Sequence, residues 1–209
     1  PASGKSGLVR AIVGFWPAVR GKDRPDGAAR VQWSPDCLAP QIGCLPQEIE
    51  LFAGTIAENK ALFDPAATPE AVTAAAGAAG VHELILRLSE GYDTRIGEGG
   101  AGLSAGLRQR IGLARALYGD PFLVIPDEPN ANLDAEGENA LTGAILGVRR
   151  RGGVCIVIAH RPSALAALDL ILMMADGRAQ AFGPKDEVLK RVLRPASVPA
   201  SPAALQERA

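Results

Sequence analysis

Two short apolar segments, residues 122–125 and 154–159, constrain the fold of this chain more than any other feature. Neither segment alternates polar with apolar residues, and such continuous apolar strands are typical of parallel sheets covered on both faces. Two parallel strands need a long crossover connection, which is usually a helix. Residues 134–150, between the two segments, have a helical pattern. The sequence therefore predicts a strand–helix–strand unit and an α/β fold.

Periodicity and turn residues predict the other elements. An Asp176-Gly177 turn predicts a hairpin. Glycines are frequent in residues 91–106, which predicts a loop. The expected strands are 42–45, 170–174 and 178–182, and the expected helices are 6–16, three within 55–90 that begin at Thr55, Pro69 and Val81, then 104–118 and 185–193.

Composition excludes several classes of protein. The chain has 209 residues, 47% hydrophobic and 22% charged, which is ordinary for a globular domain and argues against a disordered or disulfide-scaffold chain. The 22 basic and 23 acidic residues give a net charge of −1, so no basic excess is available for nucleic acid. The three cysteines lack metal-binding spacing and are interpreted as reduced thiols. No apolar run reaches the ~18 residues of a membrane span.

The first candidate site is Gly4-Lys5-Ser6, which precedes an apolar helical pattern. This is the end of the motif G-x-x-x-x-G-K-[ST], in which loop N–H groups and a helix N-terminus bind phosphate. In that motif the lysine reaches the β and γ phosphates and the hydroxyl binds Mg²⁺. Taken alone, the same three residues could form an ordinary loop.

The second candidate site is Asp127-Glu128, directly after the apolar segment 122–125 and Pro126. Ligands of α/β proteins bind at the carboxyl ends of the strands. An aspartate in this place can hold Mg²⁺, and the next carboxylate can polarise a water. The alternative is a solvated acidic turn. Pro126 removes a donor from the sheet beside these carboxylates.

Four further motifs follow a fixed order, and with them the chain resembles the nucleotide-binding domain of ABC transporters over residues 1 to about 189. They are Leu45-Pro46-Gln47, the segment 103–110, Ala131-Asn132-Leu133-Asp134 and His160. The resemblance implies a P-loop NTPase (RecA-like) fold, with a parallel sheet core and an inserted α-helical subdomain. It divides the chain into core residues 1–47, helical residues 48–118, core residues 119–190 and a tail, 191–209, expected to be disordered.

The resemblance also implies ATP and Mg²⁺ as cofactors and assigns a role to each motif. Glu128, His160 and Gln47 correspond to the catalytic residues. Ser6, Gln47 and Asp127 correspond to the metal site. The expected ATP-binding residues are Ser3, Gly4, Lys5, Ser6 and Gly7 of the phosphate loop, Ser104, Ala105 and Gly106 of the signature motif, and Asp134 of the D-loop.

Two loops resemble exporters within the family, namely residues 52–59 and 94–100. The amino-acid sequence of residues 91–100 and 127–134 is most similar to that of bacterial type I secretion ATPases. This implies a head-to-tail homodimer of nucleotide-binding domains, a transmembrane domain fused upstream, and an adaptor and outer-membrane channel as further partners. It places the domain at the cytoplasmic face of the bacterial inner membrane and predicts no nucleic-acid partner.

Several residues depart from the family pattern. Ala105 replaces a glycine and Leu107 a glutamine of the signature, Pro126 replaces an apolar strand residue, and Lys60 replaces an apolar residue. Asp23 and Pro25 interrupt an expected strand. The first glycine of the phosphate loop would precede residue 1, which predicts weak ATP binding by this chain alone. Two alternatives stay open: a weakened subunit that acts as an interaction partner, and an ABC ATPase that acts on nucleic acid or ribosomes.

Overall fold

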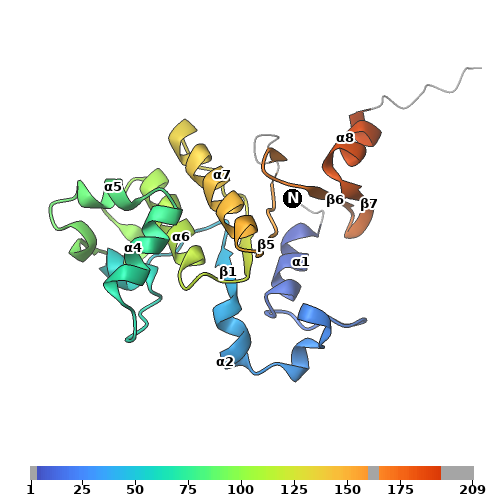
Figure 1. Cartoon of the computed structure of the whole chain (residues 1–209), viewed down its shortest axis with the longest axis horizontal. Coiled ribbons are helices and arrows are strands. Elements are labelled where there is room, and N and C mark those ends of the chain that lie inside the picture. Colours follow the sequence, from blue (N-terminus) through green and yellow to red (C-terminus); the bar gives the residue numbers. More distant parts are fainter. Residues whose placement is uncertain (1–3, 160–164, 194–209) are drawn as a thin grey trace, which may run out of the picture.

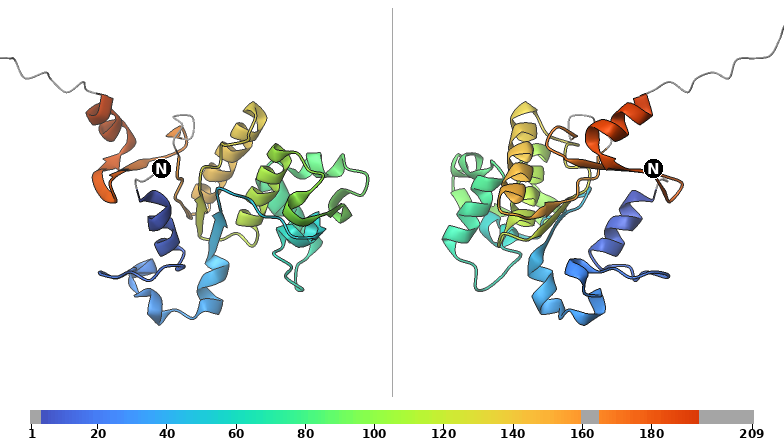
Figure 2. Two further views of the ribbon diagram at one scale, coloured as in Figure 1. Left: turned by 180° about the vertical axis from the view of Figure 1, so that it is seen from behind. Right: turned by 45° about the vertical axis from the view of Figure 1, so that its right-hand side comes forward.

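The structure is a computed structural model that describes residues 4–159 and 165–193. The predicted site residues Ser3 and His160 lie outside the described residues, as do residues 194–209 of the expected tail. A three-stranded sheet occupies the centre (Figure 1). Figure 2 shows that helices α4–α6 gather on one side of this sheet, and that a hairpin and helix α8 lie on the other.

The helices are α1 (Lys5–Ile12), α2 (Pro35–Leu38), α3 (Ile56–Lys60), α4 (Pro69–Ala78), α5 (His82–Leu86), α6 (Ala105–Leu117), α7 (Ala135–Arg150) and α8 (Lys185–Leu193). The strands are β1 (Ile42–Leu45), β2 (Gly54–Thr55), β3 (Arg95–Ile96), β4 (Leu123–Pro126), β5 (Val154–Cys155), β6 (Leu170–Ala175) and β7 (Arg178–Pro184). Single 3₁₀ turns are η1 (Pro25–Gly27), η2 (Arg30–Gln32), η3 (Ala39–Gln41), η4 (Gly91–Asp93) and η5 (Glu98–Gly100). Helix α8 extends to Leu193, three residues into the expected tail.

The central sheet has the order β1-β4-β5, and both pairs are parallel. Helix α7 connects β4 to β5, which confirms the predicted strand–helix–strand unit. In register, Leu45 of β1 lies opposite Pro126 of β4. The chain segments that follow these two residues therefore leave the sheet side by side.

Strand β5 is shorter than the predicted strand at 154–159, and Pro126 supplies the reason. Ile156 donates its N–H to the Val124 carbonyl at 2.9 Å, and Ile158 donates to the Pro126 carbonyl at 2.9 Å. Pro126 has no N–H to return a bond to this side of the ladder. The pairing of β4 with β5 is interrupted there and resumes only as an isolated bridge between Asp127 and Ile158.

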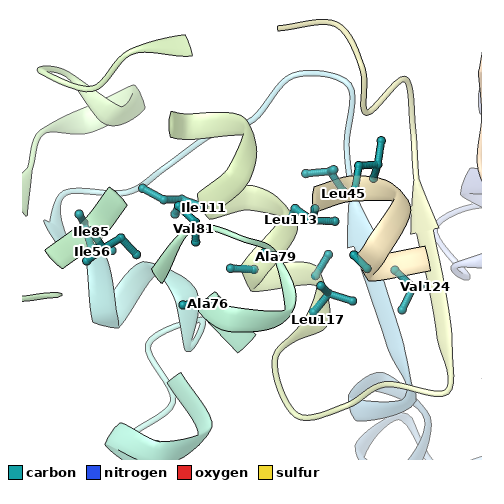
Figure 3. Close-up of a cluster of buried hydrophobic side chains, with 14 of the residues drawn as sticks. Leu45, Ile56, Ala76, Ala79, Val81, Ile85, Ile111, Leu113, Leu117 and Val124 are labelled. Atoms are coloured by element: carbon teal, nitrogen blue, oxygen red, sulfur yellow. The ribbon is translucent and has the colours of Figure 1, made fainter. Parts of the chain in front are cut away.

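The main hydrophobic core surrounds α6 (Figure 3), where Ile111, Leu113 and Leu117 pack with residues of β1, β4 and the helical side. Two glycines allow β1 and α6 to approach closely. A Cβ on Gly43 would lie 1.8 Å from the Ala116 carbonyl oxygen, and one on Gly112 would lie 2.9 Å from a methyl of Leu45. Helix α6 is thereby fixed against the strand that leads to Gln47.

Helix α1 packs through Val9 against Ile125 and Ile158, which form a second, smaller cluster. The predicted helix at 6–16 is too long, because α1 ends at Ile12. Gly14 has a φ of 89°, in the left-handed region that a right-handed helix cannot continue through. Trp16 consequently lies outside the helix, 52% exposed.

The segment between α1 and β1 forms 3₁₀ turns and α2, and its described residues contain no strand. Pro25 begins η1, and Arg30 pairs with Asp23 at 2.6 Å. The expected interruption of a strand by Asp23 and Pro25 agrees with this conformation. The hairpin of β6 and β7 is confirmed, and its turn residues Asp176 and Gly177 have positive φ values of 49° and 71°. In the described part of the chain, no helix has the length and apolar character needed to cross a bilayer.

Candidate functional site

A cavity of about 620 Å³ lies between α1 and the segments that follow β1 and β4. Its lining includes the predicted site residues Ser6, Gln47 and Asp127. These residues are far apart in the sequence and come from three different elements. The fold therefore brings part of the phosphate-loop motif, the Leu-Pro-Gln motif and the acidic pair to one place.

The start of α1 forms the first wall of the site. Gly4 is the N-cap residue, with a φ of 82°, and no side chain caps the helix. A residue other than glycine would be strained there, and its Cβ would lie 3.0 Å from the Gly177 Cα. The N–H groups of the first helical turn, which includes Lys5, Ser6 and Gly7, have no carbonyl partner within the helix. This end of α1 suits an anionic group.

The parallel register of β1 and β4 brings Gln47 and Glu128 together. Each lies two residues beyond the opposed pair Leu45 and Pro126, and the Asp127 N–H donates to the Leu45 carbonyl at 2.8 Å. The Gln47 side-chain amide then donates to a Glu128 carboxylate oxygen at 3.1 Å. Two of the three residues predicted to be catalytic are thus in direct contact.

Glu128 has a φ of 48°, which places a non-glycine residue in the left-handed region. Its N–H donates to the Ile158 carbonyl at 2.9 Å. Such backbone strain concentrates at functional sites, where surrounding contacts enforce it.

The predicted metal ligands fit Mg²⁺ by their chemistry. Ser6, Gln47 and Asp127 offer a hydroxyl, an amide and a carboxylate oxygen around one cavity, and Mg²⁺ prefers oxygen ligands, few of them carboxylates. Among the described residues, no three His, Cys, Asp or Glu side chains gather into a metal cluster. The charge of Asp127 also affects Cys44. Burial is the larger cause that raises the pKa of the Cys44 thiol, and the Asp127 carboxylate raises it further.

The signature-motif residues lie at the start of α6. Ser104 is the N-cap, as expected, and its hydroxyl accepts a hydrogen bond from the Leu107 N–H at 3.2 Å. Ser104 and Ala105 are exposed. Leu107 packs against the main core, so the leucine that replaces the signature glutamine has an apolar environment.

Asp134 is the N-cap of α7 and accepts a hydrogen bond from the Gly137 N–H at 2.8 Å. The bond from Gly137 and a second one from Arg110 hold the pKa of the Asp134 carboxyl below its usual value. None of Ser104, Ala105, Gly106 and Asp134 lines the cavity. Gly4, Lys5 and Gly7 do not line it either, but they adjoin Ser6 at the start of α1, whereas these four residues lie at the starts of α6 and α7.

Sequence reasoning missed two residues beside the signature, Gln109 and Arg110. Both are almost completely buried on α6, although polar side chains of this size are rarely buried without a partner. Gln109 donates to the Pro129 carbonyl at 3.0 Å, and Arg110 pairs with Asp134 at 2.7 Å. The available signal was their position on the apolar side of the helix next to Ile111 and Leu113.

Comparison with known proteins identifies the family to which this chain belongs. The profile described as ABC transporter matches residues 1–131. The chain belongs to the ABC transporter family. It is an ATP-binding domain of that family, whose members are ATPases. The predicted family and fold class are both confirmed.

Several ABC proteins are similar to this chain. It is 66% identical to the "Type I secretion system ATP-binding protein PrsD" of Rhizobium meliloti, over 94% of this chain and 34% of that protein. It is 41% identical to the "Cyclolysin secretion/processing ATP-binding protein CyaB" of Bordetella pertussis, over 90% of this chain and 26% of that protein. A solved bacterial Atm1-family ABC exporter with ATP bound matches with a TM-score of 0.83 and 34% identity, over 90% of this chain and 33% of that one. This ABC domain thus spans about a third or less of the length of these relatives.

Proposed function

We propose that this domain hydrolyses ATP to drive a type I protein secretion exporter. The observation that carries the proposal is the contact of 3.1 Å between Gln47 and Glu128, beside a cavity lined by Ser6 and Asp127. Gln47 and Glu128 are 81 residues apart in the sequence, and only the parallel register of β1 and β4 unites them. The names of PrsD and CyaB, which are secretion ATP-binding proteins, support the exporter class.

In this proposal the phosphates of ATP bind at the start of α1. The N–H groups of Gly4 to Gly7, with Ser3 before them, surround the phosphates, and Lys5 stabilises charge on the γ-phosphate. Ser6, Gln47 and Asp127 hold Mg²⁺, which neutralises phosphate charge when bound. Glu128 accepts a proton from the attacking water or orients it, while Gln47 fixes the Glu128 carboxylate. His160 would contact the γ-phosphate.

A second copy of the domain completes the site. Ser104, Ala105 and Gly106 do not line the cavity of their own chain, and the first two are exposed. A head-to-tail homodimer would bring the α6 N-terminus of one copy to the ATP of the other, where its dipole favours an anion. Asp134 belongs to the same half of the site. This division supports dimerisation as a condition for hydrolysis.

A transmembrane domain is the second proposed partner, on the cytoplasmic face of the bacterial inner membrane. Phe52, Leu62 and Phe63 are 55%, 62% and 44% exposed, and the rings of Phe52 and Phe63 meet edge-to-face at 6.2 Å. Apolar side chains grouped on a surface mark an interaction site. We assign residues 48–118 to the helical part that transmits movement, between core parts 1–47 and 119–190. A periplasmic adaptor and an outer-membrane channel would complete the exporter.

The test is ATP turnover and cargo secretion by the assembled exporter, with wild-type protein and Glu128→Gln. The proposal expects Glu128→Gln to lower turnover at least about 100-fold, to a small residual rate, and to stop secretion while ATP still binds. Glu187→Gln, at an exposed position on α8 outside the cavity, is the matched control and keeps wild-type turnover. Turnover in Glu128→Gln within about tenfold of the wild-type rate would refute the proposed chemistry.

The weakened-subunit alternative is favoured by one observation, the burial of Leu107 against the core in place of a polar signature residue. The same assay separates the two, since a weakened subunit gives no turnover with a wild-type sequence. Leu107→Gln would then raise turnover if the lost amide is the cause.

A further inference from the structure

The loop from Pro129 to Asp134 links the catalytic candidate Glu128 to α7, and α6 holds it at both ends. Gln109, 2% exposed, donates its side-chain amide to the Pro129 carbonyl at 3.0 Å. Arg110 pairs with Asp134 at 2.7 Å and with Glu136 at 3.3 Å. The two consecutive residues of α6 thus contact the beginning and the end of one loop.

The contact at Pro129 matters because Glu128 is strained. Its φ of 48° is uncommon for a residue with a side chain, and the following proline further restricts its backbone. One side of this strained residue is fixed by the bond from the Glu128 N–H to the Ile158 carbonyl at 2.9 Å. The other side is fixed at the next carbonyl by Gln109. Without the second contact, the chain could relax toward an ordinary conformation and the carboxylate would move.

The middle of the loop also packs against α6. A Cβ on Gly106 would lie 3.2 Å from the Asn132 carbonyl oxygen, so the first turn of α6 lies directly on the loop. That turn starts at Ser104, which is exposed. One helix therefore joins the surface that carries the signature motif to the loop that directly follows Glu128.

We propose that Gln109 is a positioning residue for Glu128, and that Arg110 secures the far end of the same loop. Gln109 acts through the Pro129 carbonyl and keeps the Glu128 carboxylate in reach of Gln47. This inference rests on the proposed function, since it assigns a part of ATP hydrolysis to residues that do not touch the nucleotide. It also implies that displacement of the α6 N-terminus is transmitted to Glu128 in the same chain.

The experiment measures kcat and KM for ATP in the assembled exporter with Gln109→Met, which keeps the side-chain length and removes the amide donor. We expect kcat to fall about 10- to 100-fold, because a misplacement of about 1 Å has effects of this size. KM and the affinity for a non-hydrolysable ATP analogue stay within about twofold. The matched control is Ile111→Val, a fully buried residue two positions further on α6 that makes no contact with the loop through a polar group. It keeps wild-type kcat at a similar loss of stability.

A double variant tests whether Gln109 works through Glu128. In the Glu128→Gln background, Gln109→Met should cause no further loss of the residual turnover, because the carboxylate that it positions is absent. A further loss as large as in the wild-type background would overturn the inference. If Gln109→Met does not fold, Arg110→Lys carries the test, with a reduced kcat at unchanged KM as the expected result.

Failure of the proposed function and failure of the positioning role give different results. If Glu128→Gln leaves turnover intact, the proposed function fails. If Glu128→Gln lowers turnover at least about 100-fold but Gln109→Met has a kcat within twofold of wild type, only the positioning role of Gln109 is refuted.

Discussion

Lys60 is a completely buried lysine at the end of α3, and its protonation should make the stability of the domain depend on pH. Its Nζ donates to the Val72 carbonyl at 2.5 Å and lies 4.7 Å from the centre of the Tyr92 ring. Burial lowers the pKa of Lys60 from 10.5 to about 7. A neutral amine still donates an N–H, so the contact with Val72 survives deprotonation.

The direction of the pH effect is set by the number of protons that the folded and unfolded states bind. Between pH 7 and 10.5 the unfolded chain binds a proton at Lys60 that the folded chain has released. The free energy of unfolding therefore rises with pH in this window. With these two pKa values, the gain between pH 7 and pH 9 is about 2 kcal/mol. For a chain of this size that gain corresponds to a rise in Tm of roughly 4 to 8 °C.

The assay is urea unfolding at pH 7 and pH 9, followed by circular dichroism, for wild type and Lys60→Met. The pH-dependent gain should be present in wild type and absent in Lys60→Met. Buried thiols titrate as well: burial raises the pKa of Cys155 to about 12, which lowers stability above pH 9, but this effect is common to both proteins and cancels in their difference. Lys22→Met, at an exposed lysine, is the control and should keep the wild-type gain. The same gain in Lys60→Met would refute the reasoning.

Three further substitutions test the packing and the caps. Gly43→Ala should destabilise the domain by on the order of 3 kcal/mol or prevent folding, because its Cβ would lie 1.8 Å from the Ala116 carbonyl oxygen. Urea unfolding measures the loss, and a loss below about 1 kcal/mol would contradict the close approach of β1 and α6. Ser104→Ala should cost about 1 kcal/mol through loss of the α6 cap, whereas Ser104→Thr retains it; equal stability of the two variants would argue against the cap. Asp134→Asn should destabilise the domain at neutral pH, because it removes the charge opposite buried Arg110. Because the pKa of Asp134 is lowered, the stability difference between wild type and Asp134→Asn should persist below the usual carboxyl pKa and vanish only in stronger acid. Urea unfolding from pH 7 down to pH 3 measures this difference, and its loss already at the usual carboxyl pKa would contradict the prediction.

Local sequence signals predicted most elements, because caps and turns act within a few residues. Ser104 begins α6 and Asp134 begins α7, where hydroxyl and carboxylate side chains satisfy the free N–H groups. The Asp176-Gly177 turn likewise fixes the hairpin of β6 and β7. The predicted end of α1 at Trp16 was wrong. The apolar spacing continues to Trp16, but the left-handed conformation of Gly14 stops the helix before it.

The site was predictable only in part. That Gln47 and Glu128 each follow a strand is visible in the sequence, but that β1 lies next to β4 and opposes Leu45 to Pro126 is a property of the sheet. The contact between the two side chains needed the register. The resemblance supplied their roles, which remain predictions.

Gln109 and Arg110 show why the remainder could not be predicted. A helical pattern places both residues on or near the apolar side of α6. From the sequence alone, two polar side chains buried there would be expected to destabilise the core. The loop 129–134 offers its Pro129 carbonyl and its Asp134 carboxylate as their partners, and it does so only once β4 and α7 have set both ends of that loop. Burial and pairing of these groups are thus a consequence of tertiary structure, and the same tertiary structure places them next to Glu128. Under the proposed role of Glu128, a buried polar pair bonded to the loop that follows it indicates positioning of that loop, in addition to an effect on stability.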